Sequence, residues 1–116
     1  MRELKLPHIA PIRFAQEILR DTQESKRVSL VFEEIPSLGM MVEAAAQSSA
    51  AYGNEDAQSG FLVSLKNVKR LQNPTKKELE VSLVNESNLG TMSSFSFEVF
   101  EAEVLCVSGN FIVAKN

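Results

Sequence analysis

The residue with the clearest chemical potential is Glu43. It is the one charged residue in the fifteen-residue stretch Leu38–Tyr52, which is otherwise apolar or built of small residues. A carboxylate in such a setting is desolvated unless it is paired or protonated, and burial raises its pKa. A raised pKa is what a general acid at neutral pH requires. The alternatives are a glutamate on an exposed turn or one held in a structural hydrogen bond.

The other potentially reactive side chains occur once each. Cys106 lies in the apolar pattern Val104–Val107 and has no second cysteine to pair with, which predicts a buried, inert thiol. His8 lies between Pro7 and Pro11. It is either a structural histidine or a catalytic base. One cysteine and one histidine exclude the familiar zinc sites. We therefore expect no metal and no nucleotide cofactor.

Size and composition indicate one domain over residues 1–116. Hydrophobic residues make up 44% of the 116, enough for one sizeable core. No apolar run reaches the roughly 18 residues that cross a bilayer. The start Met1–Lys5 mixes both charge signs with no apolar stretch behind it, unlike a signal peptide. A cytoplasmic location is the expectation.

The charge pattern argues against nucleic-acid binding. The net charge is −3, and the densest basic group lacks interleaved aromatic residues. Such a basic group is typical of a solvated strand end and turn, or of a surface that attracts an acidic partner such as a carrier protein. It consists of Lys66, Lys69, Arg70, Lys76 and Lys77.

The element that must position Glu43 is a helix. Ser37 is a good N-cap, Pro36 blocks helix upstream, and Gly53–Asn54 is a stop signal. A helix that is apolar nearly all round should be buried on most faces. Its many alanines and serines allow other elements to approach closely.

Strands are predicted on both sides of this helix, and two of the later ones, 78–84 and 93–100, alternate between polar and apolar residues, as half-buried strands do. Short turns separate the later segments, which predicts an antiparallel meander. A sheet wrapped around the helix buries all of its faces, so an α+β class is expected. The predicted strands are 27–32, 60–68, 78–84, 93–100 and 103–113, with turns at 73–76 and 86–90, an irregular segment at 1–11 and an ambiguous one at 12–20.

Three motifs resemble those of a known family, the bacterial 3-hydroxyacyl-acyl-carrier-protein dehydratases. Leu6–Pro11 resembles their "LPHRxPF" opening, and Glu43-Ala44-Ala45-Ala46-Gln47 resembles their helix signature "EAxAQ". Gly60–Leu65 is similar to the "GFLL" strand of the dehydratase-like proteins of aryl polyene pathways. The resemblance covers nearly the whole chain at low identity. It implies a hotdog fold, in which an antiparallel sheet wraps around one long central helix, and it makes 12–21 the first strand.

The resemblance also implies a reaction and an assembly. Family members are dimers whose two sheets join, with the acyl chain in a tunnel at the interface. They are hydro-lyases of fatty-acid or polyene-type lipid synthesis. Their base is a histidine in a "GHFPG" loop before the helix, and their acid is the helix carboxylate of the other subunit, which Glu43 matches. Val31–Pro36 contains no histidine, so the base would have to be His8, Glu33 or Glu34.

Three functions stay open. The chain is a dehydratase acting on thioesters of an acyl carrier protein or coenzyme A, a hotdog thioesterase that needs only Glu43, or a silent acyl-binding partner subunit. A homo-oligomer, at least a dimer, is implied, with no membrane or nucleic acid as partner. Catalytic candidates are Glu43 and His8. Substrate-binding candidates are Gly39, Met40, Gln47 and Phe61, although Met40 and Phe61 could instead pack in a core.

Overall fold

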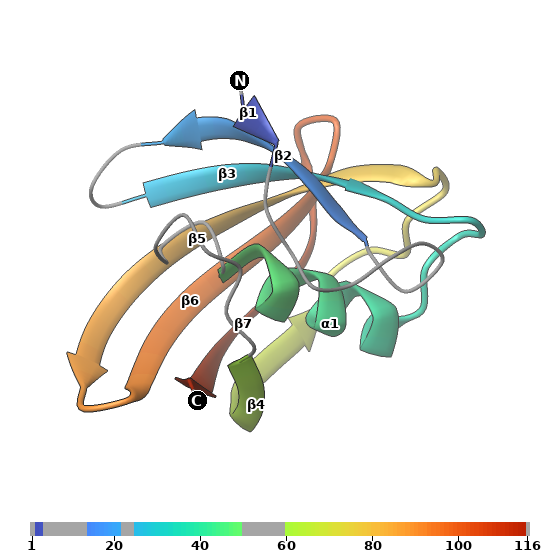
Figure 1. Ribbon diagram of the computed structural model, residues 1–116. Coiled ribbons are helices and arrows are strands. Elements are labelled where there is room, and N and C mark those ends of the chain that lie inside the picture. Colours follow the sequence, from blue (N-terminus) through green and yellow to red (C-terminus); the bar gives the residue numbers. More distant parts are fainter. Residues whose placement is uncertain (1, 4–13, 22–24, 50–59, 116) are drawn as a thin grey trace.

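The computed structural model describes residues 2–3, 14–21, 25–49 and 60–115. Seven strands form one antiparallel sheet in the order β1-β2-β3-β5-β6-β7-β4, and the helix α1 lies across one of its faces (Figure 1). The elements are β1 (Arg2–Glu3), β2 (Ala15–Asp21), β3 (Ser25–Val31), α1 (Leu38–Ser48), β4 (Gly60–Arg70), β5 (Glu78–Leu89), β6 (Met92–Glu101) and β7 (Val104–Lys115). The expected α+β class and antiparallel meander are confirmed.

The meander β5–β6–β7 supplies the centre of the sheet. Leu83 pairs with Phe97, and Phe97 pairs with Gly109, so these residues form one row across three strands. Val81 and Val99 lie in the neighbouring row and are fully buried. Because side chains alternate between the two faces of a strand, these rows all face α1. The predicted alternation therefore identifies the inner face of the sheet.

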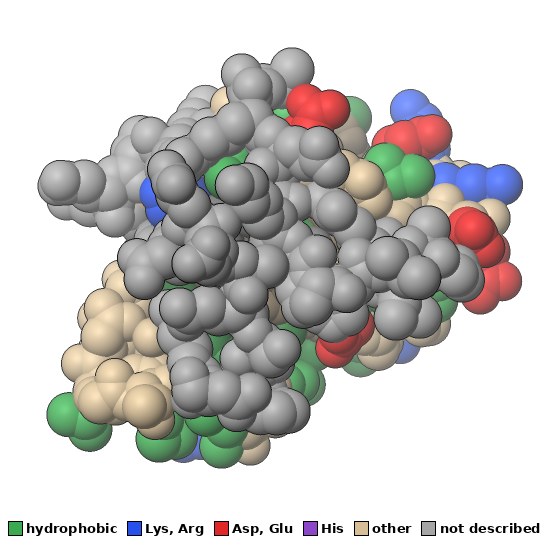
Figure 2. Space-filling view, in the orientation of Figure 1, with side chains coloured by type: hydrophobic (Ala, Val, Ile, Leu, Met, Phe, Trp, Pro, Cys, Tyr) green, Lys and Arg blue, Asp and Glu red, His purple; other side chains and the backbone are tan. Residues whose placement is uncertain are grey.

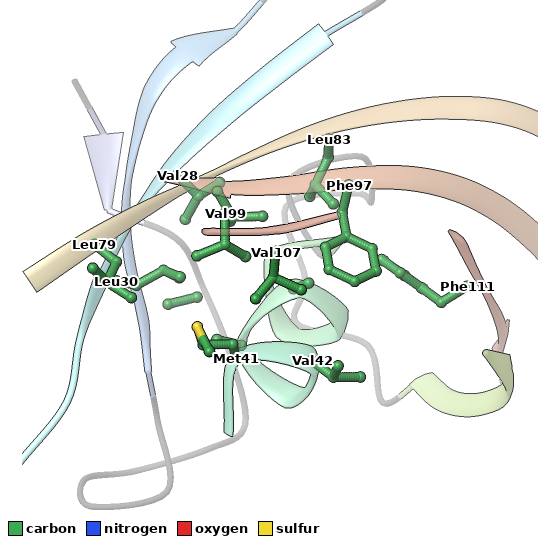
Figure 3. Close-up of a cluster of buried hydrophobic side chains, with 14 of the residues drawn as sticks. Val28, Leu30, Met41, Val42, Leu79, Leu83, Phe97, Val99, Val107 and Phe111 are labelled. Carbon is green, nitrogen blue, oxygen red and sulfur yellow. The ribbon is translucent and has the colours of Figure 1, made fainter. Parts of the chain in front are cut away.

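The core fills the space between this face and α1. Figure 3 shows side chains of the sheet, among them Leu30 and Val107, directed toward Met41 and Val42 of the helix. Ala44 and Ala45 are fully buried on the same side of α1. Their small side chains let the helix approach the strands closely, and the non-directional burial of apolar surface holds the two layers together.

The helix is exposed on the side that faces away from the sheet. Gly39 and Glu43 are exposed, and Met40 and Ala46 are half-buried. The prediction of a helix buried on most faces is wrong for the isolated chain, because the sheet covers one side of α1 only. The expected burial of Glu43 is wrong for the same reason.

The turn predicted at 86–90 is shorter than expected. β5 continues to Leu89, and the chain reverses at Gly90, whose φ is 63°. Side chains hold the two strands together in this region, since the hydroxyl groups of Ser87 and Ser94 lie 2.7 Å apart in a hydrogen bond. The composition of this segment alone had indicated a turn. In the structure its polar residues stabilise a two-stranded ribbon.

The N-terminal part of the sheet adds two strands. Arg2 pairs with Ile18, so the segment predicted to be irregular contains the short strand β1. β2 confirms the strand that the family resemblance placed at 12–21, over the residues that the structure describes. Burial of Ala15 and Ile18 explains why packing overrides the helical propensity of this segment. No helix among the described residues is long and apolar enough to span a membrane.

Candidate functional site

The exposed side of α1 carries Gly39 and Glu43, one helical turn apart. Residues four positions apart lie one above the other on a helix, so these two share a face. Glu43 is the only charged residue of α1, and the sheet leaves its carboxylate exposed. This face combines an acid–base group with the N-terminal turn of a helix.

The N-terminal turn of α1 has free donors. The Ser37 hydroxyl accepts a hydrogen bond from the Met40 backbone N–H at 3.2 Å, and the Ser37 carbonyl accepts one from Met41 at 3.1 Å. The N–H groups of Leu38 and Gly39 have no partner among the described residues. A side chain at Gly39 would meet only the Ser37 Oγ, at 4.0 Å. A carbonyl oxygen can therefore approach these donors, where the helix dipole favours negative charge.

A strip of apolar surface borders the helix along β4, the edge strand of the sheet. Leu62, Val63 and Leu65 are 40%, 53% and 42% exposed. Leu62 pairs with Val113 and Leu65 with Phe111, both inward-facing, so the two leucines lie on the face that carries α1. Exposed apolar residues along an unpaired strand edge are typical of a surface that another chain covers.

Gln47 lies on the buried side of α1. It is 4% exposed, and its Oε1 accepts hydrogen bonds from the backbone N–H groups of Phe14 (2.8 Å) and Ala15 (3.2 Å). The side chain thus joins the helix to the start of β2. Its predicted contact with substrate stays a prediction, and the sequence signal for its structural role was an amide in an otherwise apolar helix.

The remaining candidate residues are Met40, Phe61, His8, Glu33 and Glu34. Met40 is half-buried against the core. Phe61 belongs to β4, but its side chain is outside what the structure describes, and so is His8 altogether. Glu33 and Glu34 are exposed on the connection between β3 and α1. The structure therefore places the two glutamates on the segment that leads into the helix carrying Glu43.

Cys106 takes no part in this site. It is buried, as predicted, and burial raises the pKa of its thiol, which keeps it protonated and unreactive. Within the described residues no cluster of His, Cys, Asp and Glu side chains could hold a metal ion.

The opposite face of the sheet carries a polar depression of about 330 Å³, away from Glu43. Its lining includes Ser82, Ser96 and Ser108, which alternate with buried residues along their strands. The predicted basic group is exposed, but Figure 2 shows acidic side chains next to basic ones at the end of the molecule that carries the β3–α1 and β4–β5 connections. This visible face has no continuous basic area among the described residues.

Comparison with solved structures decides the fold. The dehydratase heterocomplex ApeI:P from Xenorhabdus doucetiae superposes with a TM-score of 0.78 at 14% identity, covering 96% of this chain and 88% of the other. The chain has the hotdog fold. A homologue of HP0420 from Helicobacter felis gives 0.72 at 17% identity, covering 97% and 85%. A hypothetical thioesterase with coenzyme A from Streptococcus pneumoniae gives 0.67 at 11% identity, covering 86% and 84%.

These identities are too low for the hotdog chain to inherit an activity from its structural neighbours, which include both a dehydratase and thioesterases. No protein-family model matches the sequence, and no curated protein matches it either. The function must therefore be argued from the site.

Proposed function

We propose that this hotdog chain binds an acyl thioester with the thioester carbonyl at the N-terminus of α1 and with Glu43 as the acid–base group. The observation that carries the proposal is the position of Glu43, exposed one turn from Gly39 on the side of α1 that the sheet leaves uncovered. Free N–H groups at Leu38 and Gly39 would polarise the carbonyl, and Glu43 would exchange the proton.

The acyl chain would lie between two copies of the protein. Pairing of β4 with β4 of a second copy would extend the sheet and cover Leu62, Val63 and Leu65. The apolar strip next to α1 would then become the wall of an enclosed channel, with Phe61 on the same strand and Met40 on the helix as further wall candidates. Glu43, exposed in the isolated chain, would be desolvated in this assembly, as a general acid requires.

Dehydration is the reaction we favour. A base removes the proton from the carbon next to the carbonyl, the bond from the neighbouring carbon to its hydroxyl breaks, and Glu43 protonates the departing hydroxyl. The products are an enoyl thioester and water. Glu34, Glu33 or His8 would be the base. The likeness to a dehydratase heterocomplex supports this proposal at the level of the fold.

Thioester hydrolysis is the second candidate. One carboxylate suffices for it, because Glu43 could activate a water molecule that attacks the carbonyl and releases the thiol. The observation in its favour is that the described residues offer Glu43 no histidine as a second group. Likeness to a thioesterase with coenzyme A supports it equally at the level of the fold.

A third role is that of a partner subunit. The name of the Xenorhabdus dehydratase describes a heterocomplex. By analogy, this chain would pair with a different hotdog subunit that supplies the missing base. Glu43 would then be needed only in the mixed assembly, or not at all.

The deciding experiment follows two products at once. Crotonyl and 3-hydroxyacyl thioesters of coenzyme A and of an acyl carrier protein are assayed for hydration and for free thiol. Hydration without thiol release indicates a dehydratase, and the reverse indicates a thioesterase. Glu43→Gln should lower either rate by roughly 10²- to 10⁴-fold, whereas Glu98→Gln, an exposed carboxylate on β6, should not. An unchanged rate in Glu43→Gln contradicts the catalytic proposal, and no activity favours the partner subunit.

A further inference from the structure

We infer that Gln47 is a positioning residue, whose amide fixes the rotation and axial position of α1 and thereby the direction in which Glu43 points. Only the catalytic consequence of this inference rests on the proposed function. The mechanical part concerns the contact between α1 and β2, which is present in the isolated chain.

The contact joins two neighbouring amides of β2 to one oxygen of the helix. Gln47 Oε1 lies 2.8 Å from the Phe14 nitrogen and 3.2 Å from the Ala15 nitrogen. Ala15 is fully buried and Gln47 is 4% exposed, so water cannot replace this acceptor. Because two neighbouring amides of β2 bind the same oxygen, they fix the position of that oxygen along the strand as well as its distance from the strand.

Over the part of the chain that the structure describes, the rest of the helix surface makes no such directional contact with the sheet. The small side chains of Ala44 and Ala45 allow the helix to approach the sheet closely. They fix neither the rotation of the helix about its axis nor its position along that axis. The hydroxyls of Ser48 and Ser49 donate to carbonyl groups of α1 itself, at 2.8 and 2.6 Å. These bonds stabilise the helix end without tying it to the sheet.

Glu43 depends on this contact because it lies one turn from Gln47. A rotation of α1 that released Gln47 from β2 would turn Glu43 by the same angle and in the same direction, so its carboxylate would point elsewhere. A displacement of about 1 Å at a reacting group can lower a rate by roughly 100-fold. The inference is therefore that Gln47 contributes to catalysis through the geometry of Glu43 and without touching the substrate.

Thiol labelling measures the rotation of the helix directly. Glu43→Cys places a cysteine on the exposed side of α1, and Val42→Cys places one on the buried side, where Val42 is 6% exposed. Cys106 does not compete, because it is buried and its pKa is raised. At dilutions at which light scattering shows a monomer, the ratio of the two labelling rates reports which side of the helix faces water. It is measured in the unmodified background and with Gln47→Met, which keeps the side-chain length but removes the acceptor.

Two further variants distinguish a change in the rotation of α1 from a loss of stability. Ser48→Ala removes a buried hydrogen bond at the next helix position, one that lies within α1, and leaves the bonds from Gln47 to β2 in place. Gln47→Glu keeps an acceptor oxygen for both amides. We expect Gln47→Met to change the ratio of exposed-side to buried-side labelling by at least roughly tenfold, since about 1.4 kcal/mol, within the range for one buried hydrogen bond, corresponds to a factor of ten and two such bonds are lost. Ser48→Ala and Gln47→Glu should keep it within a factor of about two.

An unchanged ratio in Gln47→Met overturns the inference. Should that variant not fold, amide exchange in the unmodified chain decides, since rapid exchange at Phe14 and Ala15 would equally overturn it. In thioester assays, Gln47→Met should lower kcat by roughly 10- to 100-fold with KM nearly constant, and Ser48→Ala should change neither. Absence of turnover in the unmodified chain contradicts the two catalytic candidates, favours the partner subunit, and leaves labelling to decide the role of Gln47.

Discussion

Glu43 and Gln47 lie one turn apart on α1, yet Glu43 is exposed and Gln47 is bound to the backbone of β2. The boundary between the open and the buried side of the helix runs between them. One short motif, Glu43-Ala44-Ala45-Ala46-Gln47, therefore supplies the proposed acid–base group, the close-packed alanines and the contact that orients the helix. Its spacing matters because four residues rotate the helix by slightly more than one full turn, which places the two polar side chains side by side across this boundary.

The pH dependence of stability should report Glu101. Its carboxylate accepts hydrogen bonds from the Thr75 N–H (2.6 Å), the Thr75 hydroxyl (2.8 Å) and the Lys76 N–H (2.7 Å). The Thr75 backbone bond is the largest cause that lowers the pKa of Glu101 from its ordinary 4.5. A lowered pKa in the folded state means a contribution that is present above about 4.5 and is lost as the pH falls through the folded value.

The measurement compares melting temperatures of the unmodified chain and Glu101→Gln across pH. We expect the unmodified chain to melt higher near neutral pH and the difference to shrink as the pH falls below about 4.5. Glu103→Gln, an exposed neighbour in the same turn region, should give a small difference that varies little. A difference for Glu101→Gln that grows on acidification would refute the assignment.

Gly109 is predicted to be intolerant of any side chain. A Cβ at this position would lie 2.9 Å from Phe97 Cε1 and 3.2 Å from Val68 Cγ2. Phe97 is 1% exposed, and its ring packs against Phe111 with the ring centroids 5.6 Å apart. Gly109→Ala should therefore destabilise the fold by about 1–3 kcal/mol through overpacking.

The matched substitution is Gly39→Ala, where the nearest atom to a new Cβ is 4.0 Å away. It should be neutral or stabilise by up to about 1 kcal/mol, because alanine is the better helix former. Urea unfolding measures both variants. Equal stabilities for the two would mean that the contact of Gly109 with Phe97 is looser than the structure shows.

Most of the fold could be predicted from local sequence patterns. Alternation with period two identified β5 and β6, because each side chain along a strand reports its own face, and an apolar run identified β7. Ser37 marked the start of α1, because capping depends on the first turn alone. The strand at 15–21 needed the family resemblance, since its residues favour helix and only burial against the sheet makes them extended.

The features that the sequence could not supply are those that depend on distant partners. Gln47 bonds to residues 32 and 33 positions away, so the sequence marks it only as an amide in an otherwise apolar helix and does not identify its partners. The exposure of Glu43 depends on how far the sheet curls around the helix, which no residue of α1 encodes. The serines and asparagines at 85–88 are equally suited to a turn or to a ribbon held by side-chain bonds, and the pairing of Ser87 with Ser94 decides it.

The edge strand β4 should mediate a dimer of this chain. Val63 is 53% exposed and lies next to a bulge in the pairing with β7, at the unpaired margin of the described sheet. Val63→Lys would place two equal charges near the symmetry axis of a β4–β4 dimer. Like charges brought together at an interface are strongly unfavourable, so the dissociation constant should rise by at least about tenfold.

Light scattering over a dilution series measures this, with Leu89→Lys as the matched control. Leu89 is 81% exposed at the β5–β6 turn, so the same charge is added on a strand that β6 and β7 separate from β4. Val63→Lys should dissociate at concentrations where Leu89→Lys stays dimeric, and thioester binding should be lost with the dimer, because the apolar strip beside α1 would be uncovered again. A Val63→Lys variant that remains dimeric would place the interface elsewhere, and with it the wall of the proposed acyl channel.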